Sequence, residues 1–188
     1  MIDSKLAYKY YIEEDKKAYG ISKDNLPFRL NPYFIDSEIW IFQKCLRKCE
    51  YLFNKKTNNP FTKLLKFIYA YRYKKLSIRL GFTLPINCFG PGLRIMHRGT
   101  IFVNGNCKIG SNCTINACVN IGSKTDIEIN VPTIGNNVYI GPGVKIFDKI
   151  FIADGCVIGA NAVVNKSFIN PNVVIAGIPA IERGMAKK

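Results

Sequence analysis

An aliphatic residue recurs at every sixth position through much of the second half of the chain, and this repeat restricts the possible folds more than any other feature. Ten of thirteen positions in the series are Ile or Val, and the residue that follows is often glycine. The series consists of His97, Val103, Ile109, Ile115, Ile121, Ile134, Ile140, Ile146, Ile152, Ile158, Val164, Asn170 and Ala176. A six-residue unit cannot bury its apolar residue alone, so successive units must stack to form a shared core.

The repeat predicts a mainly β chain in which each unit forms one short strand and a bend of a parallel β-helix. The period breaks once, between Ile121 and Ile134, which are thirteen residues apart instead of twelve. Residues 123–128 lie in this break and are largely polar. We expect them to leave the wall as a protruding loop.

The residues before Gly81 show a helical pattern instead. Apolar residues recur at spacings of three and four over residues 36–53, which predicts a helix with one buried face. A second helix is predicted over residues 60–80, because Asn59 can cap its start and Gly81 can end it. A weaker helix is expected over residues 5–18. The sequence therefore predicts a small helical region at 1–81 and a β-helix domain at 82–188. The side chains expected to be buried are Ile39, Phe42, Leu46, Cys49 and Phe53 in the first of these helices, and Leu64, Leu65, Phe67, Ile68, Tyr71 and Leu76 in the second.

The composition indicates a globular, basic protein. The chain has 27 Lys and Arg against 13 Asp and Glu, a net charge of +14, which favours an anionic partner without identifying it. No apolar run reaches the length of a membrane span and no signal peptide is evident, so we expect a cytoplasmic location. Seven cysteines in such a chain are expected to be reduced thiols, with Cys107, Cys113 and Cys156 at small-residue positions of the repeat.

The repeat region resembles the hexapeptide-repeat acyltransferases, whose domain is a left-handed parallel β-helix. Within that family it is most similar to the serine acetyltransferase branch, and particularly to its shorter members associated with capsule and exopolysaccharide O-acetylation. The segments that carry the resemblance are Gly90-Pro91-Gly92-Leu93-Arg94-Ile95-Met96-His97, Thr100-Ile101-Phe102-Val103-Asn104, Val119-Asn120-Ile121-Gly122 and Ala176-Gly177-Ile178-Pro179-Ala180.

The resemblance implies that His97 is the general base, which removes a proton from an acceptor hydroxyl as that hydroxyl attacks the thioester of acetyl-CoA. The alternative is a packed histidine, because His97 falls in the phase that Ile or Val occupies elsewhere. The neighbouring Gly90, Gly92 and Gly99 favour catalysis. His97 is the only histidine, so a zinc site built from several histidines is excluded and we expect no metal.

Two positions depart from the serine-specific pattern. Phe82 stands about where the resemblance implies an Asp paired with the histidine, and residues 122–133 contain neither the Arg nor the His that would hold serine. Asp126 and Glu128 are loop carboxylates near the acceptor that could instead orient His97, or they are simply solvated charges.

The resemblance also implies a coenzyme groove between neighbouring β-helices of a homotrimer. The matching positions are Gly122, Pro142, Ala160, Ile178 and Pro179, with Lys166 and Arg183 as basic residues toward the phosphates. For the small residues, the tight turns of a β-helix are a sufficient alternative explanation.

The sequence thus favours an acetyl-CoA-dependent O-acetyltransferase acting on a sugar hydroxyl of a surface polysaccharide precursor. Serine O-acetylation and a non-catalytic trimeric scaffold remain alternatives. The basic, aromatic helix at 60–80 allows contact with the inner face of an acidic membrane, although a solvated helix face explains it as well. Nucleic acid ranks last, since no recognised motif accompanies the charge.

Overall fold

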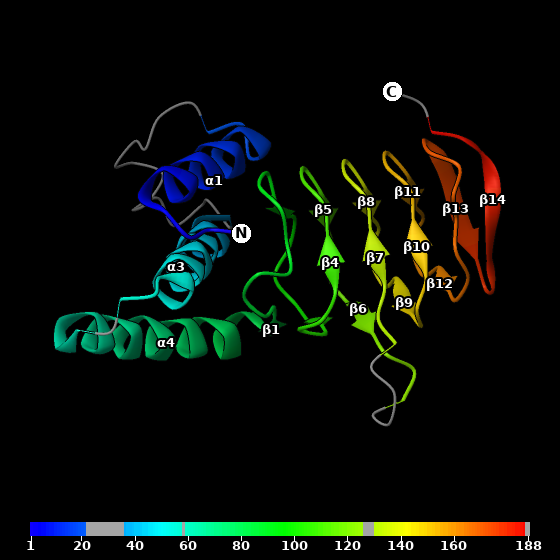
Figure 1. Cartoon of the computed structure of the whole chain (residues 1–188). Helices are drawn as coiled ribbons and strands as arrows, with labels where there is room; N and C mark the ends of the chain where they lie inside the picture. The colour runs from blue at the N-terminus through cyan, green and yellow to red at the C-terminus, as the bar shows by residue number, and fades with distance from the viewer. Residues whose placement is uncertain (22–35, 58, 126–129, 187–188) are drawn as a thin grey trace.

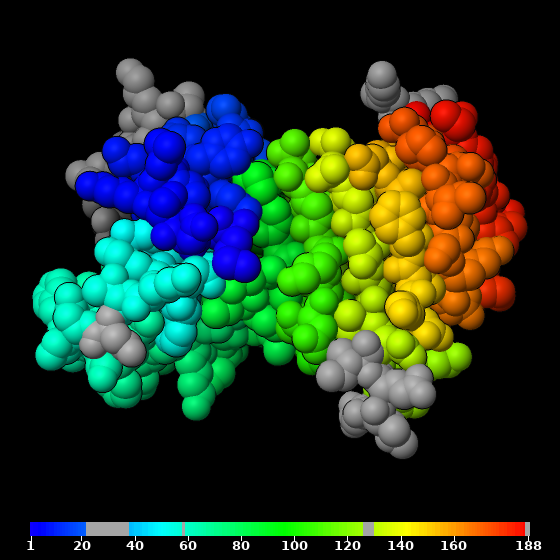
Figure 2. Space-filling model, viewed as in Figure 1, coloured from blue at the N-terminus to red at the C-terminus, as the bar shows by residue number. Residues whose placement is uncertain are grey.

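The computed structural model describes residues 1–21, 36–57, 59–125 and 130–186. Three helices, α1 (Lys5–Ala18), α3 (Asp36–Asn54) and α4 (Pro60–Leu80), lie at one end of a stack of short strands (Figure 1). The space-filling view shows that the helices cover this end of the stack (Figure 2). None of the described helices combines the length and apolar character needed to cross a membrane.

The strands wind into a β-helix of three sheets, and most coils contribute a strand to each sheet. All pairings between coils are parallel, and only the last pair, β13 and β14, is antiparallel. The first sheet contains β1 (Phe82–Thr83), β3 (Ile101–Val103), β6 (Val119–Gly122), β9 (Lys145–Phe147) and β12 (Val163–Val164). The second contains β4 (Lys108–Ile109), β7 (Thr133–Ile134) and β10 (Phe151–Ile152). The third contains β2 (Arg94–Ile95), β5 (Thr114–Ile115), β8 (Tyr139–Ile140), β11 (Val157–Ile158), β13 (Val173–Gly177) and β14 (Ala180–Met185).

The aliphatic residues of the repeat point inward and form a continuous core, as the period predicts. Ile115, Ile140 and Ile158 align in one sheet and are fully buried. The predicted series is wrong at its two ends. Near the C-terminus, Phe168 and Ile175 occupy the inward positions in place of Asn170 and Ala176.

At the other end, Ile95 and not His97 pairs with Ile115 and is fully buried. The reason is a longer corner: five residues separate Ile95 from Ile101, whereas three separate Ile115 from Val119, although the flanking pairs are in register. The two extra residues put His97 outside the core.

The break between Ile121 and Ile134 is an insertion in one coil. Ile109 pairs with Ile134, which is 25 positions later, whereas Ile134 pairs with Ile152 after 18 positions, so this coil holds seven extra residues. The insertion follows β6, and its described parts, residues 123–125 and 130–132, lie at the lower edge of the stack in Figure 1. Asp126 and Glu128 are in the part of the insertion that falls outside the described residues.

Both predicted caps of α4 are present. Asn59 Oδ1 accepts a hydrogen bond from Thr62 N at 2.7 Å, and Gly81 ends the helix with a left-handed φ of 77°. The predicted buried face of α4 is largely wrong, because α4 packs mainly against α3 and β1 and no other described segment covers its far side. Exposed there are Leu64, Phe67, Ile68 and Tyr71. In α3, Phe53 is likewise exposed, and Leu52 is buried instead.

A buried ionic cluster joins the helices to the first coil. Arg47 of α3 contacts Asp15 of α1 at 2.8 Å and Glu50 at 3.0 Å, and all three side chains are inaccessible or nearly so. Asp15 Oδ1 also accepts hydrogen bonds from Gly92 N and Leu93 N at 2.9 and 3.0 Å. The charges of Asp15 and Glu50 keep the pKa of Arg47 above its ordinary value in spite of burial. This cluster fixes the segment that leads into the His97 corner.

Candidate active site

His97 lies on the corner between β2 and β3, with its side chain exposed to solvent. The backbone on either side is held in place: Met96 N donates to Ile115 O at 2.9 Å and Gly99 N donates to Leu80 O at 3.1 Å. Among the described residues the imidazole makes no hydrogen bond.

The glycines that flank His97 have a structural explanation. Gly99 has a φ of 131°, and a Cβ atom there would lie 3.3 Å from Ala117 Cβ. A Cβ atom on Gly90 would lie 2.8 Å from the backbone of Gly110. Close stacking of coils therefore requires these glycines, and they do not by themselves distinguish a catalytic from a structural histidine.

Three of the predicted coenzyme positions lie on the same corner of the stack as His97, each one or more coils further along. Pro142 follows β8 and Ala160 follows β11, and both are exposed. Gly143 N donates to Ala117 O at 3.0 Å and Asn161 N to Pro142 O at 2.8 Å, which keeps successive corners in line. Ile178, in the turn after β13, continues the row and is 74% exposed.

Pro179 completes the turn between β13 and β14 and follows a cis peptide bond. Arg183 lies on β14, and its guanidinium is close to the position that a Cβ atom on Gly177 would take, at 3.6 Å. The row that starts at His97 thus ends beside a cationic side chain. With neighbouring strands about 4.8 Å apart, the four steps from His97 to Ile178 span roughly 19 Å.

Gly122 and Lys166 do not join this row. They lie on the opposite edge of the first sheet, where the chain passes from β6 and β12 toward the second sheet. Gly122 is not demanded by the fold, because a Cβ atom there would meet Phe102 at 3.4 Å, an ordinary contact distance. It lines a groove of about 400 Å³ together with Phe102, Asn120, Ser123, Lys124, Lys145, Ile146 and Phe147.

Two residues on the corner were not anticipated. Cys118 is the one exposed thiol among seven free cysteines, and it lies between the coils of His97 and Pro142. Lys145 Nζ donates to the Cys118 carbonyl at 2.7 Å, which places a cation next to the row. The signal for Lys145 was its outward position on a strand, since it follows the inward Val144 and precedes the inward Ile146.

Phe82 is buried in the core and stacks edge-on against Phe42, with ring centroids 5.1 Å apart. The position therefore supplies no carboxylate to His97. The described carboxylate that reaches this corner is Glu38 of α3, which pairs with the neighbouring Arg98 at 3.4 Å.

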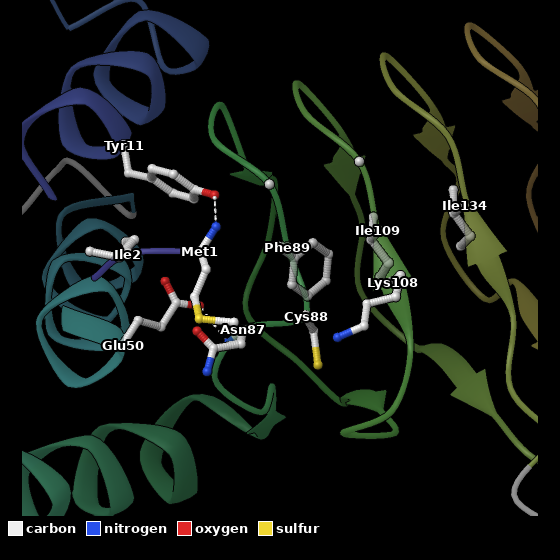
Figure 3. Close-up of a pocket in the computed structure, with 12 residues that line it drawn as sticks. Met1, Ile2, Tyr11, Glu50, Asn87, Cys88, Phe89, Lys108, Ile109 and Ile134 are labelled. Atoms are coloured by element: carbon white, nitrogen blue, oxygen red, sulfur yellow. Dashed lines mark hydrogen bonds between the residues drawn. The ribbon is translucent and has the colours of Figure 1, made fainter. Parts of the chain in front are cut away.

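A separate cavity of about 360 Å³ lies between the N-terminal segment and the first coils (Figure 3). Its walls include Met1, Tyr11, Glu50, Phe89 and Ile109, and the terminal amine donates to the Tyr11 hydroxyl at 3.2 Å. None of the predicted site residues lines this cavity, so the His97 corner remains the candidate site.

Sequence comparison relates up to about half of the chain to known acetyltransferases, although no family model matches the chain. A serine acetyltransferase of Mycobacterium tuberculosis is 33% identical over 96 residues, which are 50% of this chain and 42% of the relative. A galactoside O-acetyltransferase of Escherichia coli is 55% identical over 47 residues, 25% of this chain and 23% of the relative. The chain spans less than half the length of either relative.

Solved structures of serine acetyltransferases share the fold across nearly the whole chain. That of Brucella abortus aligns with a TM-score of 0.70 and 22% identity, covering 97% of this chain and 71% of its own. The soybean apoenzyme aligns with a TM-score of 0.71 and 19% identity, covering 95% and 69%. The Brucella protein has also been solved with coenzyme A bound. These likenesses confirm the left-handed β-helix and its helical N-terminal region.

Proposed function

We propose that this chain, whose repeat region is related to the hexapeptide-repeat acyltransferases, is an acetyl-CoA-dependent O-acetyltransferase with His97 as its general base. The observation that carries the proposal is the exposed imidazole of His97 at one end of a row of small or apolar corner residues that ends beside Arg183. A long, narrow coenzyme with a thioester at one end and phosphates at the other fits such a row.

The chemistry needs one base and one leaving group. A nitrogen of His97 takes the proton from the acceptor hydroxyl while its oxygen attacks the thioester carbonyl carbon. The tetrahedral intermediate then collapses, the carbon–sulfur bond breaks, and the imidazolium returns the proton to the CoA sulfur. The products are an acetyl ester and free CoA thiol, with no metal and no redox step.

We infer that the active unit is a homotrimer with the groove between chains. Gly122 and Lys166 lie on the opposite edge of the first sheet from His97, so one chain alone does not bring them to the same groove. A neighbouring chain would supply Gly122 and Lys166 if that edge of its first sheet faced the His97 corner. Closed cyclic symmetry allows this arrangement.

A sugar hydroxyl of a surface polysaccharide precursor is the acceptor we propose. The insertion after Gly122 contains no Arg or His in sequence, so it offers no guanidinium for bidentate hydrogen bonds to a free amino acid carboxylate. The relative named for galactoside O-acetylation also supports a glycan acceptor. Serine is the second candidate, because several relatives carry the name serine acetyltransferase.

The uncovered side of α4 supports peripheral contact with an anionic membrane surface. α4 contains no acidic residue, so a second copy of the same face would repel it, whereas an anionic lipid surface would attract it. Its exposed apolar side chains are Phe61, Leu64, Phe67, Ile68, Tyr71 and Ile78, and its cations are Lys63, Lys66, Arg72, Lys74, Lys75 and Arg79.

The deciding experiment measures CoA thiol release from acetyl-CoA with L-serine and with a panel of glycan acceptors. We expect release with glycans, and a loss of about 10²- to 10⁴-fold in His97→Ala. Lys149→Ala, an exposed change on another corner, is the matched control and should remain fully active. Release with serine alone would transfer the assignment to serine O-acetylation. No release and no acetyl-CoA binding would support a scaffold.

A further inference from the structure

A third hollow, which no residue of the His97 corner lines, lies among the three helices. It has a volume of about 240 Å³. Its lining comes from α1, α3 and α4, and consists of Tyr8, Ile41, Lys44, Cys45, Lys48, Tyr69 and Arg72. None of these residues takes part in acetyl transfer as proposed above, and we call this hollow the helical pocket.

Three of the lining residues are cations held on aromatic rings. Lys48 Nζ lies 5.2 Å from the ring centre of Tyr8 and 5.9 Å from that of Tyr69. The guanidinium of Arg72 lies 5.8 Å from the ring centre of Tyr69, and Lys44 Nζ lies over Trp40 at 5.4 Å. Cation–π contacts fix the positions of these groups but leave their charge in place.

No carboxylate lines the helical pocket, since the acidic side chains described on α1 and α3 are paired elsewhere. Asp15 and Glu50 belong to the buried cluster with Arg47. Glu38 pairs with Arg79 and Arg98. Glu13 pairs with Lys16 and Glu14 with Lys17. α4 has no acidic residue, and within the part of the chain that the structure describes no carboxylate pairs with Lys48 or Arg72, so their charge can be used by a ligand.

The surroundings of Cys45 agree with this excess of positive charge. A hydrogen bond from Cys49 and the nearby charge of Arg72 lower the pKa of the Cys45 thiol, although burial opposes them. The thiol itself is 5% exposed and donates toward the Tyr69 carbonyl at 3.8 Å, so it belongs to the pocket wall.

We propose that the helical pocket binds a phosphate group, held by Lys48 and Arg72. A dianion matches a site with two cations, because a planar guanidinium can donate two parallel hydrogen bonds to phosphate oxygens while an ammonium acts as a point charge. The hydroxyls of Tyr8 and Tyr69 supply further donors. The phosphate can belong to a soluble phosphate ester or to a lipid headgroup, since Arg72 lies on the helix whose far side is apolar and exposed.

The test uses the full chain without acetyl-CoA, so it does not depend on the proposed activity. Binding of inorganic phosphate is measured by calorimetry at constant ionic strength set with chloride. The paired variant Lys48→Gln/Arg72→Gln is compared with Lys5→Gln/Lys149→Gln, which removes the same charge from exposed positions outside the pocket and outside α4. We expect the pocket variant to weaken phosphate binding about tenfold or more and the control to leave it unchanged.

A second arm measures sedimentation with vesicles of phosphatidic acid in phosphatidylcholine against phosphatidylcholine alone. Dependence on Lys48 and Arg72 with vesicles but not with inorganic phosphate would identify a lipid headgroup, and the reverse would identify a soluble ester. The proposal is overturned if both probes bind the pocket variant as well as they bind the control variant, or if neither probe binds the wild-type chain. Circular dichroism of both variants verifies that they are folded.

Discussion

Glu38 of α3 forms an ion pair with Arg98, the residue that follows His97, at 3.4 Å. The same carboxylate pairs with Arg79 in the last turn of α4. The side chains of Glu38 and Arg98 are 28% and 50% exposed, and pairs this exposed contribute about 0–1 kcal/mol. Their expected role is therefore to hold the backbone of the corner in position, with little effect on the stability of the fold.

Replacing Glu38 by Gln is expected to lower kcat several-fold, because Arg98 and the adjoining His97 lose their tether to α3. The KM for acetyl-CoA should change little, and the free energy of unfolding should fall by no more than about 1 kcal/mol. Glu13→Gln, which removes an exposed pair on α1, is the control. Steady-state kinetics and urea unfolding measure both effects, and an unchanged kcat would show that Glu38 does not position the corner.

A mixing experiment tests whether the site is shared between chains. His97→Ala and Gly122→Phe are each expected to be inactive, since one removes the base and the other fills the groove beside Phe102. When the two are co-refolded in equal amounts, about a quarter of the sites in random trimers would combine an intact His97 with an intact Gly122 from the neighbour. Recovery of activity on that scale is the expected outcome. A mixture as inactive as its components, with trimers verified by light scattering, would contradict the shared site.

The rate at which Cys118 is alkylated should report whether the coenzyme binds along the corner that contains His97. It is the one exposed thiol, whereas burial raises the pKa of Cys88 to about 11, of Cys107 to about 12 and of Cys113 to about 11. These buried thiols remain protonated at pH 8, and Cys45, whose pKa is lowered, is only 5% exposed. Iodoacetamide should therefore modify Cys118 first, as mass spectrometry of the peptides would show. Acetyl-CoA should slow this modification. Unchanged labelling in the presence of saturating acetyl-CoA would place the coenzyme elsewhere.

Arg47 is the residue whose loss should most destabilise the junction. Arg47→Met would leave the buried carboxylates of Asp15 and Glu50 without their cation, at a cost of about 3–5 kcal/mol in the free energy of unfolding. Urea unfolding measures this, with the exposed Lys17→Met as the control. A loss below 1 kcal/mol would mean that water reaches the cluster.

The architecture could be predicted because the repeat acts on every coil at once. An error at one position, such as Asn170, does not change the stacking that the remaining aliphatics require. The caps of α4 could also be predicted, because Asn59 and Gly81 act through local backbone geometry.

The sequence did not predict correctly whether His97 lies inside or outside the core. The period suggested that it points inward, but two additional residues in its corner transfer that position to Ile95. Sequence alone does not reveal where extra residues enter a coil when the flanking strands keep their register. The prediction that Leu64 and Phe67 are buried was wrong. An apolar helix face indicates burial, but the sequence does not show whether another part of the chain covers that face.

The contacts to the first coil could not be predicted, because they depend on tertiary structure. Asp15 is 77 positions from Gly92 in the sequence, yet Asp15 Oδ1 accepts a hydrogen bond from Gly92 N. No local pattern marks Asp15 among the neighbouring Glu13 and Glu14, which remain paired on the surface.

The antiparallel pairing of β14 with β13 has a consequence for how copies of the chain can assemble. A stack of parallel coils presents unpaired backbone groups at each end and would accept another stack there, growing into a filament. Here the return strand occupies one edge of the last coil, and at the opposite end α1 and α3 bind the backbone of the first coil through Asp15 and Arg47. Because β14 runs against the direction of the coils, the parallel ladder of the third sheet does not continue beyond β13.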